Sequence, residues 1–236
     1  MRIDIWSDIV CPWCAIGKAH LESALRRFEH AEQVQVVWRS FELDPGAPAL
    51  REGQYADLLA GKYGTSRRGA EAMIDNMTSR AAMVGLDFHF ERIRPGNSFD
   101  AHRLVHLGAA RGLQGPVKNR LLTAYLSEGA AIGHRETLAR LGTEAGLEPA
   151  DVRSVLTSGA YADAVRADEA EAARLQITGV PFFVIDGRYA IPGAQPPDVM
   201  LATLERAWGD GARLVTVAGD GQACGPDGCT PEAGQA

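Results

Sequence analysis

The chain has 236 residues, of which 46% are hydrophobic and 23% charged, an ordinary composition for a globular protein that needs no disulfide for stability. Its net charge is −6 and its basic residues form no stripe, which argues against a nucleic-acid partner. No apolar run approaches the roughly 18 residues of a membrane span, and the N-terminus lacks the apolar core of a signal peptide, so we expect a cytoplasmic protein with no membrane partner.

The first part of the chain predicts a strand, a helix and a second strand. Residues 2–7 are rich in Ile and Trp, which is typical of a short strand. After Cys11, apolar residues recur at helical spacing and give the next segment one buried stripe. Residues 32–43 alternate and contain several β-branched side chains, so we expect the second strand there.

The middle of the chain, from about residue 50 to residue 176, predicts helices and no strand. Gly and Pro residues separate the helical patterns. Two of the starts carry a recognisable signal, with Ser98 as a capping residue and Pro149 in a first turn. The expected helices span 51–62, 66–84, 98–111, 116–127, 135–145, 149–157 and 160–175.

Strand patterns return in residues 179–195, where two short apolar runs flank Asp186 and Gly187. An Asp-Gly pair between such runs is a strong signal for a β-hairpin. A final helix is expected to begin after Pro197. The glycine-rich residues 209–236 are expected to form a flexible tail.

This order of elements indicates an α/β fold, with a βαβ start and a ββα finish separated by a long helical segment. We therefore expect a discontinuous core, formed by residues 1–47 and 172–210, and an inserted all-helical domain, residues 48–171. Residues 211–236 complete the expected organisation as a C-terminal tail with a second cysteine pair.

The sequence CPWC places Cys11 and Cys14 at the start of the first expected helix. Unpaired backbone N–H groups and the helix dipole favour an anion there, so we expect the pKa of Cys11 to be lowered and its thiolate to be the nucleophile. Cys14 lies one turn further along, within disulfide reach, and is expected to resolve the mixed disulfide. Trp13 offers a substrate an apolar surface beside the sulfur.

A zinc site is an alternative explanation for the cysteines, because structural zinc takes about four ligands in a tetrahedron. It would need both pairs, Cys11 with Cys14 and Cys224 with Cys229. The second pair is separated by four residues in a glycine-rich tail, and Pro-Trp between two zinc ligands is unusual. Redox chemistry is therefore favoured, and no metal is predicted.

Three motifs, SDIVCPWCAIGK, NSFDAHRL and GVPFFVIDGRYAIPGAQ, make residues 1–208 similar to the DsbA-type thioredoxin-fold oxidoreductases, specifically to their cytoplasmic FrnE-like branch. The resemblance implies a thioredoxin fold with a large helical domain inserted between its βαβ and ββα halves. It also implies a cis peptide bond before Pro181, beside the redox pair. The Val180 backbone would then turn toward the sulfur and hydrogen-bond a substrate chain.

Related isomerases and kappa-type glutathione transferases share this fold and often the Asn-x-x-x-Ala-His-Arg-Leu pattern. In them a serine commonly stands at the position of Cys11 and glutathione is the cofactor, so the two cysteines here favour disulfide chemistry. The resemblance places Asn97 and His102 at the border of the substrate groove. The alternative is that Asn97 caps a helix and His102 packs inside the helical domain.

Two acidic residues near the cysteines are candidates for a proton relay. Asp4 lies in the first strand, which this fold buries on both faces, and a buried acid beneath the redox pair could pass a proton to Cys14. Asp8 lies just before the active-site turn. Its favoured alternative is a structural role, in which its side chain accepts hydrogen bonds from backbone N–H groups.

The C-terminal sequence CGPDGC contains Cys224 and Cys229, and its four central residues suit a type I turn that brings the cysteines within disulfide range. We expect a second redox pair that exchanges with the first. An inert disulfide or a zinc site is the alternative.

The predicted activity is that of a thiol–disulfide oxidoreductase or isomerase, which acts on protein or small-molecule disulfides through the CPWC dithiol and needs no cofactor. The predicted partners are a substrate that carries a disulfide or thiol and, as a further small molecule, glutathione. The alternatives are a glutathione-dependent isomerase or transferase of the same fold, and a cysteine-ligated zinc-binding module.

Overall fold

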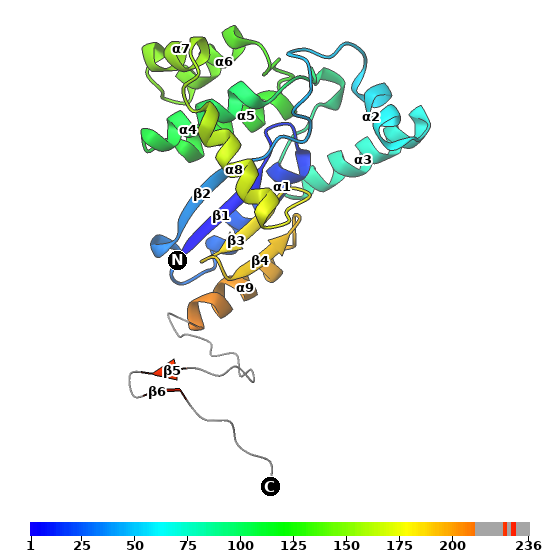
Figure 1. The fold of residues 1–236 in the computed structure, drawn as a ribbon. Helices are drawn as coiled ribbons and strands as arrows, with labels where there is room; N and C mark the ends of the chain where they lie inside the picture. Colours follow the sequence, from blue (N-terminus) through cyan, green and yellow to red (C-terminus); the bar gives the residue numbers. More distant parts are fainter. Residues whose placement is uncertain (211–223, 226–227, 230–236) are drawn as a thin grey trace.

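The computed structural model describes residues 1–210, 224–225 and 228–229. Figure 1 shows a sheet with helices packed around it, most of which follow one another between the second and third strands of the chain. The strands are β1 (Arg2–Ser7), β2 (Gln35–Ser40), β3 (Phe182–Ile185), β4 (Tyr189–Pro192), β5 (Cys224–Gly225) and β6 (Gly228–Cys229). The helices are α1 (Pro12–Leu25), α2 (Tyr55–Tyr63), α3 (Arg67–Met83), α4 (Phe99–Ala110), α5 (Gln114–Leu126), α6 (Arg135–Glu144), α7 (Pro149–Thr157), α8 (Ala162–Arg174) and α9 (Pro197–Gly209). Short 3₁₀ turns span Ala31–Gln33 and Phe90–Arg92.

Four strands form one mixed sheet in the order β2-β1-β3-β4. β1 pairs with β2 in parallel and with β3 in antiparallel orientation, and β3 and β4 form an antiparallel hairpin. Ile5 lies opposite Trp38 of β2 and Phe183 of β3, which fixes the register across the centre of the sheet. A βαβ unit and a ββα unit therefore share one sheet, which confirms the expected α/β class and thioredoxin topology.

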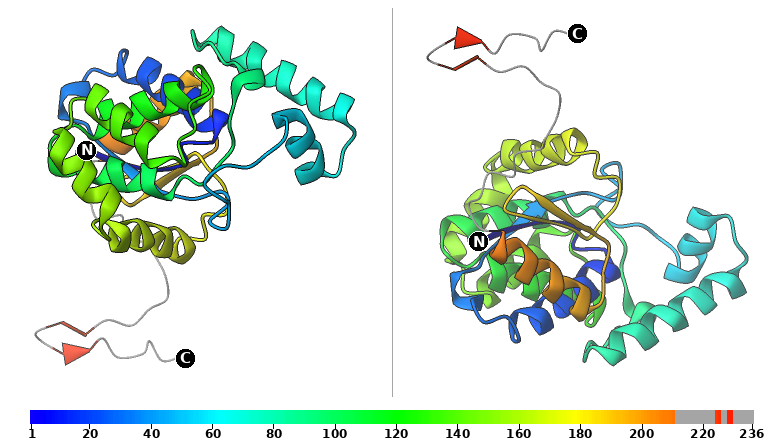
Figure 2. Two further views of the ribbon diagram at one scale, coloured as in Figure 1. Left: turned by 90° about the horizontal axis from the view of Figure 1, so that it is seen from above. Right: turned by 90° about the horizontal axis from the view of Figure 1, so that it is seen from below.

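Side chains of β1 alternate between the two faces of the sheet, as strand geometry requires. Ile3 and Ile5 belong to the main hydrophobic core, together with buried residues of α1 and α9. Trp6 lies on the opposite face, where it packs against Ala172 of α8 and its Nε1 donates a hydrogen bond to the Asp168 carbonyl at 2.9 Å. Figure 2 shows α8 and α9 on opposite sides of the sheet.

The helices between β2 and β3 pack onto the sheet through the same core, which includes Leu104 of α4 and Leu121 of α5. Gln114 ties α5 to the edge strand β2. Its side chain accepts a hydrogen bond from the Trp38 N–H at 3.0 Å and donates one to the Trp38 carbonyl at 2.9 Å. Because an edge strand leaves such backbone groups unpaired, this contact both covers the edge and fixes α5 against the sheet.

The predicted elements agree with the observed ones in type and order. The first strand has its predicted bounds, and the hairpin turns at Asp186 and Gly187, which both have positive φ. The second strand is shorter than expected, because residues 31–33 form a 3₁₀ turn before it. Ser98 is the N-cap residue of α4, but its side chain makes no capping hydrogen bond.

Across the part of the chain that the structure describes, no helix is both long enough and apolar enough to cross a membrane. In the expected tail, β5 and β6 pair in antiparallel orientation, with Cys224 opposite Cys229. The remainder of that segment, from residue 211 onward, lies outside the described residues.

Candidate active site

The cysteines of the CPWC sequence lie at the N-terminus of α1. Cys11 is the N-cap residue and has an extended backbone. Pro12 occupies the first turn, where a backbone N–H would have no partner within the helix, so the proline costs no hydrogen bond. The Cys14 N–H donates a hydrogen bond to the Cys11 carbonyl at 3.0 Å, which closes this turn. Both residues are free thiols, and Cys11 is 4% exposed whereas Cys14 is 0% exposed. Cys11 is therefore the sulfur nearer to solvent.

The loop before β3 faces Cys11. The peptide bond between Val180 and Pro181 is cis, as the resemblance implies. The Cys11 thiol donates a hydrogen bond to the Val180 carbonyl, with 3.7 Å between sulfur and oxygen. Gly17 permits α1 to approach this loop, because a Cβ at that position would lie only 2.9 Å from the Pro181 Cγ. The structure thus brings three of the predicted site residues together.

A lysine from α5 is buried beneath the cysteines. Lys118 is fully enclosed, and its Nζ donates a hydrogen bond to the Ser7 carbonyl at 3.2 Å. The same ammonium group lies 5.5 Å from the centre of the Trp38 ring. Burial lowers the pKa of Lys118 from 10.5 to about 8, although the negative charge of Cys14 opposes this shift.

The Ser7 hydroxyl is a second buried polar group at this position. Its Oγ has no hydrogen-bond partner within ordinary distance and angle among the described residues. Its proximity to Cys14 contributes to a lower pKa of that thiol, although the two groups make no regular hydrogen bond. A buried hydroxyl without a regular partner is uncommon, because leaving it unpaired costs free energy. Ser7 is therefore available to stabilise a Cys14 thiolate.

Asp8 and His102 form a buried pair next to the cysteines, with 3.2 Å between Asp8 Oδ1 and His102 Nε2. Asp8 also accepts a hydrogen bond from the Leu43 N–H at 2.7 Å. Burial alone would raise the pKa of Asp8, but the interactions with His102 and Leu43 outweigh it and lower that pKa. Burial lowers the pKa of His102, even though Asp8 opposes the shift. At neutral pH the pair therefore consists of a carboxylate and a neutral imidazole.

The two thiols ionise as one coupled pair. A hydrogen bond with Cys14, followed by burial, raises the pKa of Cys11 well above 9.0. Burial also opposes the ionisation of Cys14, but the hydrogen bond from Cys11 and the charge of Lys118 outweigh it and lower its pKa. One proton is therefore shared between the two sulfurs, and each thiol affects the pKa of the other. The positive charge of Lys118 favours a thiolate at Cys14, whereas the Asp8 carboxylate opposes one at Cys11. The nucleophilic role expected for Cys11 stays a prediction.

Asp4 does not lie beneath the cysteines, so its expected role as a proton relay is wrong. Its carboxylate pairs with Arg39 at 2.7 Å, and Arg39 pairs in turn with Asp168 of α8 at 2.9 Å. This is the face of the sheet that carries Trp6, because alternate residues of a strand point to opposite faces. The expected position of His102 at the border of a substrate groove is also wrong, since the residue is 1% exposed.

Trp13, the residue after Pro12 at the start of α1, is 37% exposed. The guanidinium group of Arg80, from α3, lies 5.7 Å from the centre of its ring. α3 therefore reaches the active-site end of α1, and Trp13 presents an apolar surface to solvent beside the cysteines.

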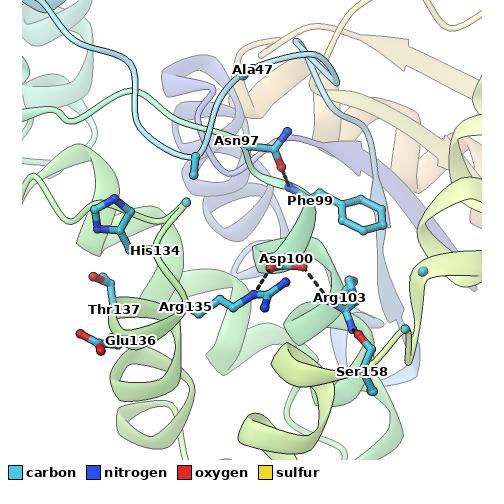
Figure 3. Close-up of a pocket in the computed structure, with 14 residues that line it drawn as sticks. Ala47, Asn97, Phe99, Asp100, Arg103, His134, Arg135, Glu136, Thr137 and Ser158 are labelled. Carbon is cyan, nitrogen blue, oxygen red and sulfur yellow. Dashed lines mark hydrogen bonds and ion pairs between the residues drawn. The ribbon is translucent and has the colours of Figure 1, made fainter.

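Asn97 lies in the wall of a separate cavity of about 900 Å³, which α4, α6 and the loop after β2 help to line. Its Oδ1 accepts a hydrogen bond from the Phe99 N–H at 2.8 Å, which is a capping interaction at the start of α4. Figure 3 shows both residues in this wall, near the ion pairs of Asp100 with Arg103 and Arg135. Neither active-site cysteine lines this cavity.

Among residues 1–210 and the short described strands of the tail, no group of three or more His, Cys, Asp or Glu side chains could hold a metal ion. The four-cysteine zinc alternative requires Cys224 and Cys229, whose side chains lie outside the described residues.

Sequence reasoning missed two residues of this site, Ser7 and Lys118. Ser7 ends the strand that leads directly into the active-site turn, so its position in the sequence is a usable signal. Lys118 carries no such signal, because one lysine within a helical pattern usually belongs to a solvated surface.

A thioredoxin topology, with two free thiols at the N-terminus of the first helix and a cis-proline loop against them, defines a thiol–disulfide oxidoreductase or isomerase. The family model of the DSBA-like thioredoxin domain matches residues 2–205. The chain belongs to this family, and it is an enzyme of the DsbA-like oxidoreductase and isomerase class.

The comparisons also identify similar individual proteins. The chain is 44% identical to a probable DsbA oxidoreductase from Streptomyces coelicolor, with a TM-score of 0.86 and coverage of 98% of this chain and 99% of that one. It is 29% identical over 201 residues to the uncharacterized protein YwbO of Bacillus subtilis, covering 84% of this chain and 93% of that protein. The cytosolic disulfide reductase DsbM from Pseudomonas aeruginosa, in a structure with GSH, shares the fold at 20% identity, with a TM-score of 0.61 and coverage of 88% and 99%.

Proposed function

We propose that this enzyme exchanges disulfides of protein or small-molecule substrates through the CPWC dithiol, with Cys11 attacking and Cys14 resolving. The observation that carries the proposal is the coupled pair of free thiols, in which Cys11 is nearer to solvent and shares a proton with Cys14. When Cys11 attacks one sulfur of a substrate disulfide, its proton passes along the shared hydrogen bond to Cys14. The other substrate sulfur leaves with the electron pair of the broken bond.

In the second step Cys14 attacks the Cys11 sulfur of the mixed disulfide and releases the remaining substrate thiol. The protein then holds a Cys11–Cys14 disulfide, and the substrate has gained two electrons. The reverse sequence oxidises a dithiol substrate. Potentials of related dithiols range from about −270 to −120 mV, so either direction is chemically accessible to this pair.

Substrate contacts form part of the proposal. The Val180 carbonyl lies 3.7 Å from the Cys11 sulfur, close enough for an extended substrate chain beside the mixed disulfide to hydrogen-bond to it. The exposed Trp13 ring supplies apolar contact at the same end of α1. Asn97 is retained as a candidate contact for a longer substrate, because it lines a cavity on the neighbouring helical segment.

The finer assignment to the FrnE-like branch, and action in the cytoplasm, also belong to the proposal. Three motifs around Cys11, His102 and Pro181 support them, in the order and spacing quoted above. Fractionation of cells that express the full-length chain with a C-terminal epitope tests the compartment, and recovery outside the cytoplasm would refute it.

Reduction of a protein disulfide by dithiothreitol, followed with and without the enzyme and without glutathione, tests the proposed reaction. We expect turnover by the wild type, none by Cys11→Ser, and a trapped mixed disulfide with Cys14→Ser. Turnover that appears only when glutathione is added would favour the glutathione-dependent alternative. Zinc bound stoichiometrically by the reduced protein, with no turnover, would favour the metal-binding alternative.

We further propose that Cys224 and Cys229 form a second redox pair, which exchanges with the first. Their positions opposite each other in a two-stranded ladder support a pair that closes on itself. A Cys14→Ser, Cys229→Ser double variant tests the exchange. Mild oxidation at low protein concentration should link Cys11 to Cys224 within one chain, which peptide mass spectrometry detects. Dimers or unlinked peptides alone would refute the exchange.

A further inference from the structure

Arg80 of α3 is an exposed arginine without an acidic partner. Its Nε donates a hydrogen bond to the Asn76 Oδ1 at 2.9 Å, and its guanidinium carbon lies 5.7 Å from the centre of the Trp13 ring. Among the described residues, no carboxylate lies within ion-pair distance of it. Every arginine of α5, α6 and α8, by contrast, pairs with a glutamate or an aspartate. The folded chain therefore leaves the positive charge of Arg80 uncompensated.

Two contacts hold the Arg80 guanidinium group in one orientation. The bond to Asn76 uses Nε, and the Nη1 and Nη2 groups have no hydrogen-bond partner among the described residues. A planar guanidinium group with two free donors can bind a carboxylate through two parallel hydrogen bonds. Because Asn76 and Trp13 already restrict the side chain, binding costs little further conformational entropy. Arg80 is thus prearranged to bind a carboxylate of another molecule.

Arg80 lies on an arm, formed by α2 and α3, that reaches the active-site end of α1. Figure 2 shows these two helices side by side, projecting from the rest of the molecule. The ring of Tyr55, at the start of α2, lies 5.2 Å from the ring of Phe90. Burial and then the negative charge of Cys11 raise the pKa of Tyr55, so the tyrosine is near that sulfur. Both helices of the arm therefore contribute a side chain to the surroundings of the dithiol.

Other charged groups at this end of α1 are buried or paired. The Asp8 carboxylate and the Lys118 ammonium group are both fully buried. Lys18, further along α1, pairs with Glu22 at 2.7 Å. The net charge of −6 is spread over the whole chain, and salt screens exposed charges that lie more than about 8 Å apart at physiological ionic strength. A substrate at the active site therefore meets the charge of Arg80 with little competition.

We propose that Arg80 determines specificity by binding a carboxylate of a peptide or unfolded protein segment whose disulfide is exchanged at Cys11. This inference rests on the proposed thiol–disulfide exchange, and it names the substrate class as polypeptides with acidic residues near the cysteine. Arg80 contacts Trp13 and not Cys11, so the carboxylate and the disulfide occupy different positions along the substrate. Four extended residues span about 13 Å, so acidic residues within this distance of the substrate cysteine are the ones to test.

Single-turnover reduction of matched peptides measures this preference. Full-length protein with Cys224→Ser and Cys229→Ser, reduced at Cys11 and Cys14, is mixed in excess with a peptide that holds one internal disulfide. The two electrons and two protons of the dithiol pass to the peptide, so one enzyme disulfide forms for each peptide disulfide that breaks. Acid quenching followed by mass spectrometry gives the second-order rate constant.

Three peptides carry Glu, Gln or Lys at the same positions on both sides of each cysteine. Their rates of reduction by dithiothreitol correct for differences in the intrinsic reactivity of the disulfides. Glutathione disulfide is a fourth substrate, because it presents carboxylates on a small molecule. The measured quantity is the ratio of the corrected rate constants for the acidic and the neutral peptide.

In the wild type we expect this ratio to be about 5, which is at the upper end for one exposed ion pair. Arg80→Met keeps an apolar contact with the Trp13 ring and should lower the ratio to about 1. Arg80→Lys should keep part of the preference, because lysine retains the charge without the planar pair of donors. Arg80→Glu should favour the basic peptide, and added salt should weaken the wild-type preference.

Arg68→Met is the matched control. Arg68 is exposed in the first turn of the same helix and has no acidic partner among the described residues. It lies about 18 Å from Arg80 along the helix axis, which is beyond the range of its charge in physiological salt. We expect this variant to keep the wild-type ratio.

An equal ratio in the wild type and Arg80→Met would overturn the role of Arg80 and leave the proposed function standing. A structural role would give that result, because it lowers the rates of both peptides by the same factor. A preference for glutathione disulfide that Arg80→Met removes, with none for the acidic peptide, would overturn the assignment to polypeptides. If the wild type reduces none of these disulfides, the proposed function itself fails, and this inference fails with it.

Discussion

Replacing Lys118 with methionine should stabilise the folded protein at neutral pH. The methionine side chain has a similar length but carries no charge, so it removes the cost of enclosing an ammonium group among the core residues of α5 and the sheet. Exchange of a buried charge for an apolar group of similar volume is often stabilising. Such a gain would show that the protein keeps this lysine at a cost to its folding stability.

The pKa of Lys118 sets the size of the effect. It falls from 10.5 to about 8 in the folded state, and each pKa unit corresponds to ~1.4 kcal/mol, so the charged group costs about 3 kcal/mol of folding free energy at pH 7. The lost hydrogen bond to the Ser7 carbonyl, 3.2 Å long, offsets about 1 kcal/mol of the gain. We therefore expect Lys118→Met to raise the free energy of unfolding by about 2 kcal/mol at pH 7.

The pH dependence follows from the sign of this shift. Below pH 8 both folded and unfolded states bind the proton, and the folded state bears its full cost. Between about pH 8 and pH 10.5 the folded state releases the proton first, so the cost disappears as pH rises. The difference in the free energy of unfolding between Lys118→Met and the wild type should therefore shrink as the pH rises through this window.

Guanidinium denaturation of the disulfide-oxidised proteins measures this difference without titration of the active-site thiols. In that form the cysteine charges that raise the pKa of Lys118 are absent, so the expected gain is at least as large. Lys62→Met is the control, because Lys62 is exposed and its charge lies 5.9 Å from the Tyr63 ring. The control should change the free energy of unfolding by less than about 0.5 kcal/mol. A loss of stability in Lys118→Met at pH 7, or an equal gain at pH 7 and above pH 10, would refute the reasoning.

Three further outcomes are expected. An alkylating reagent should modify Cys11 faster than Cys14 in the reduced protein, because Cys11 is 4% exposed and Cys14 is fully enclosed; equal rates at peptide resolution would contradict the assignment of Cys11 as the attacking thiol. Asp8→Asn should lower the pKa of Cys11, because the Asp8 carboxylate raises it. Ultraviolet titration of the thiolates in protein that also carries Cys224→Ser and Cys229→Ser measures this pKa, and an unchanged titration would count against the electrostatic role of Asp8. Gly17→Ala should destabilise the fold by about 1–3 kcal/mol and slow disulfide exchange, because its Cβ would lie 2.9 Å from the Pro181 Cγ; wild-type stability and turnover would show that the loop yields without cost.

Local patterns predicted most of the fold. The Ile and Trp residues of β1 and the Asp186–Gly187 turn are local features of the sequence, and they specified a strand and a hairpin before any partner was known. Proline at the start of α7 marked a helix boundary for the same reason, since the ring constrains the backbone of its own residue. The second strand was predicted too long because a 3₁₀ turn precedes it, and no local signal forbade either structure there.

The active site was predictable only where its chemistry is local. The strand, Cys11 and Pro12 follow one another, so the sequence placed a thiol at a helix N-terminus. The face on which Asp4 lies could also have been read from strand alternation, because the residue two positions later, Trp6, shares that face. The expectation of burial on both faces obscured this, and the structure assigns Asp4 to the ion pair with Arg39.

The sequence by itself determined the order of the elements, the position of the dithiol and the class of chemistry it performs. The tertiary structure decided which charged and polar groups surround the dithiol, because α5 and α4 bring Lys118 and the His102 partner of Asp8 to this end of α1 from distant parts of the chain. Hydrogen bonds along a helix or turn join residues near in sequence, so sequence patterns record them. The pKa of a buried thiol depends on charges within a few ångströms in space, and only the packing of helices onto the sheet sets those distances.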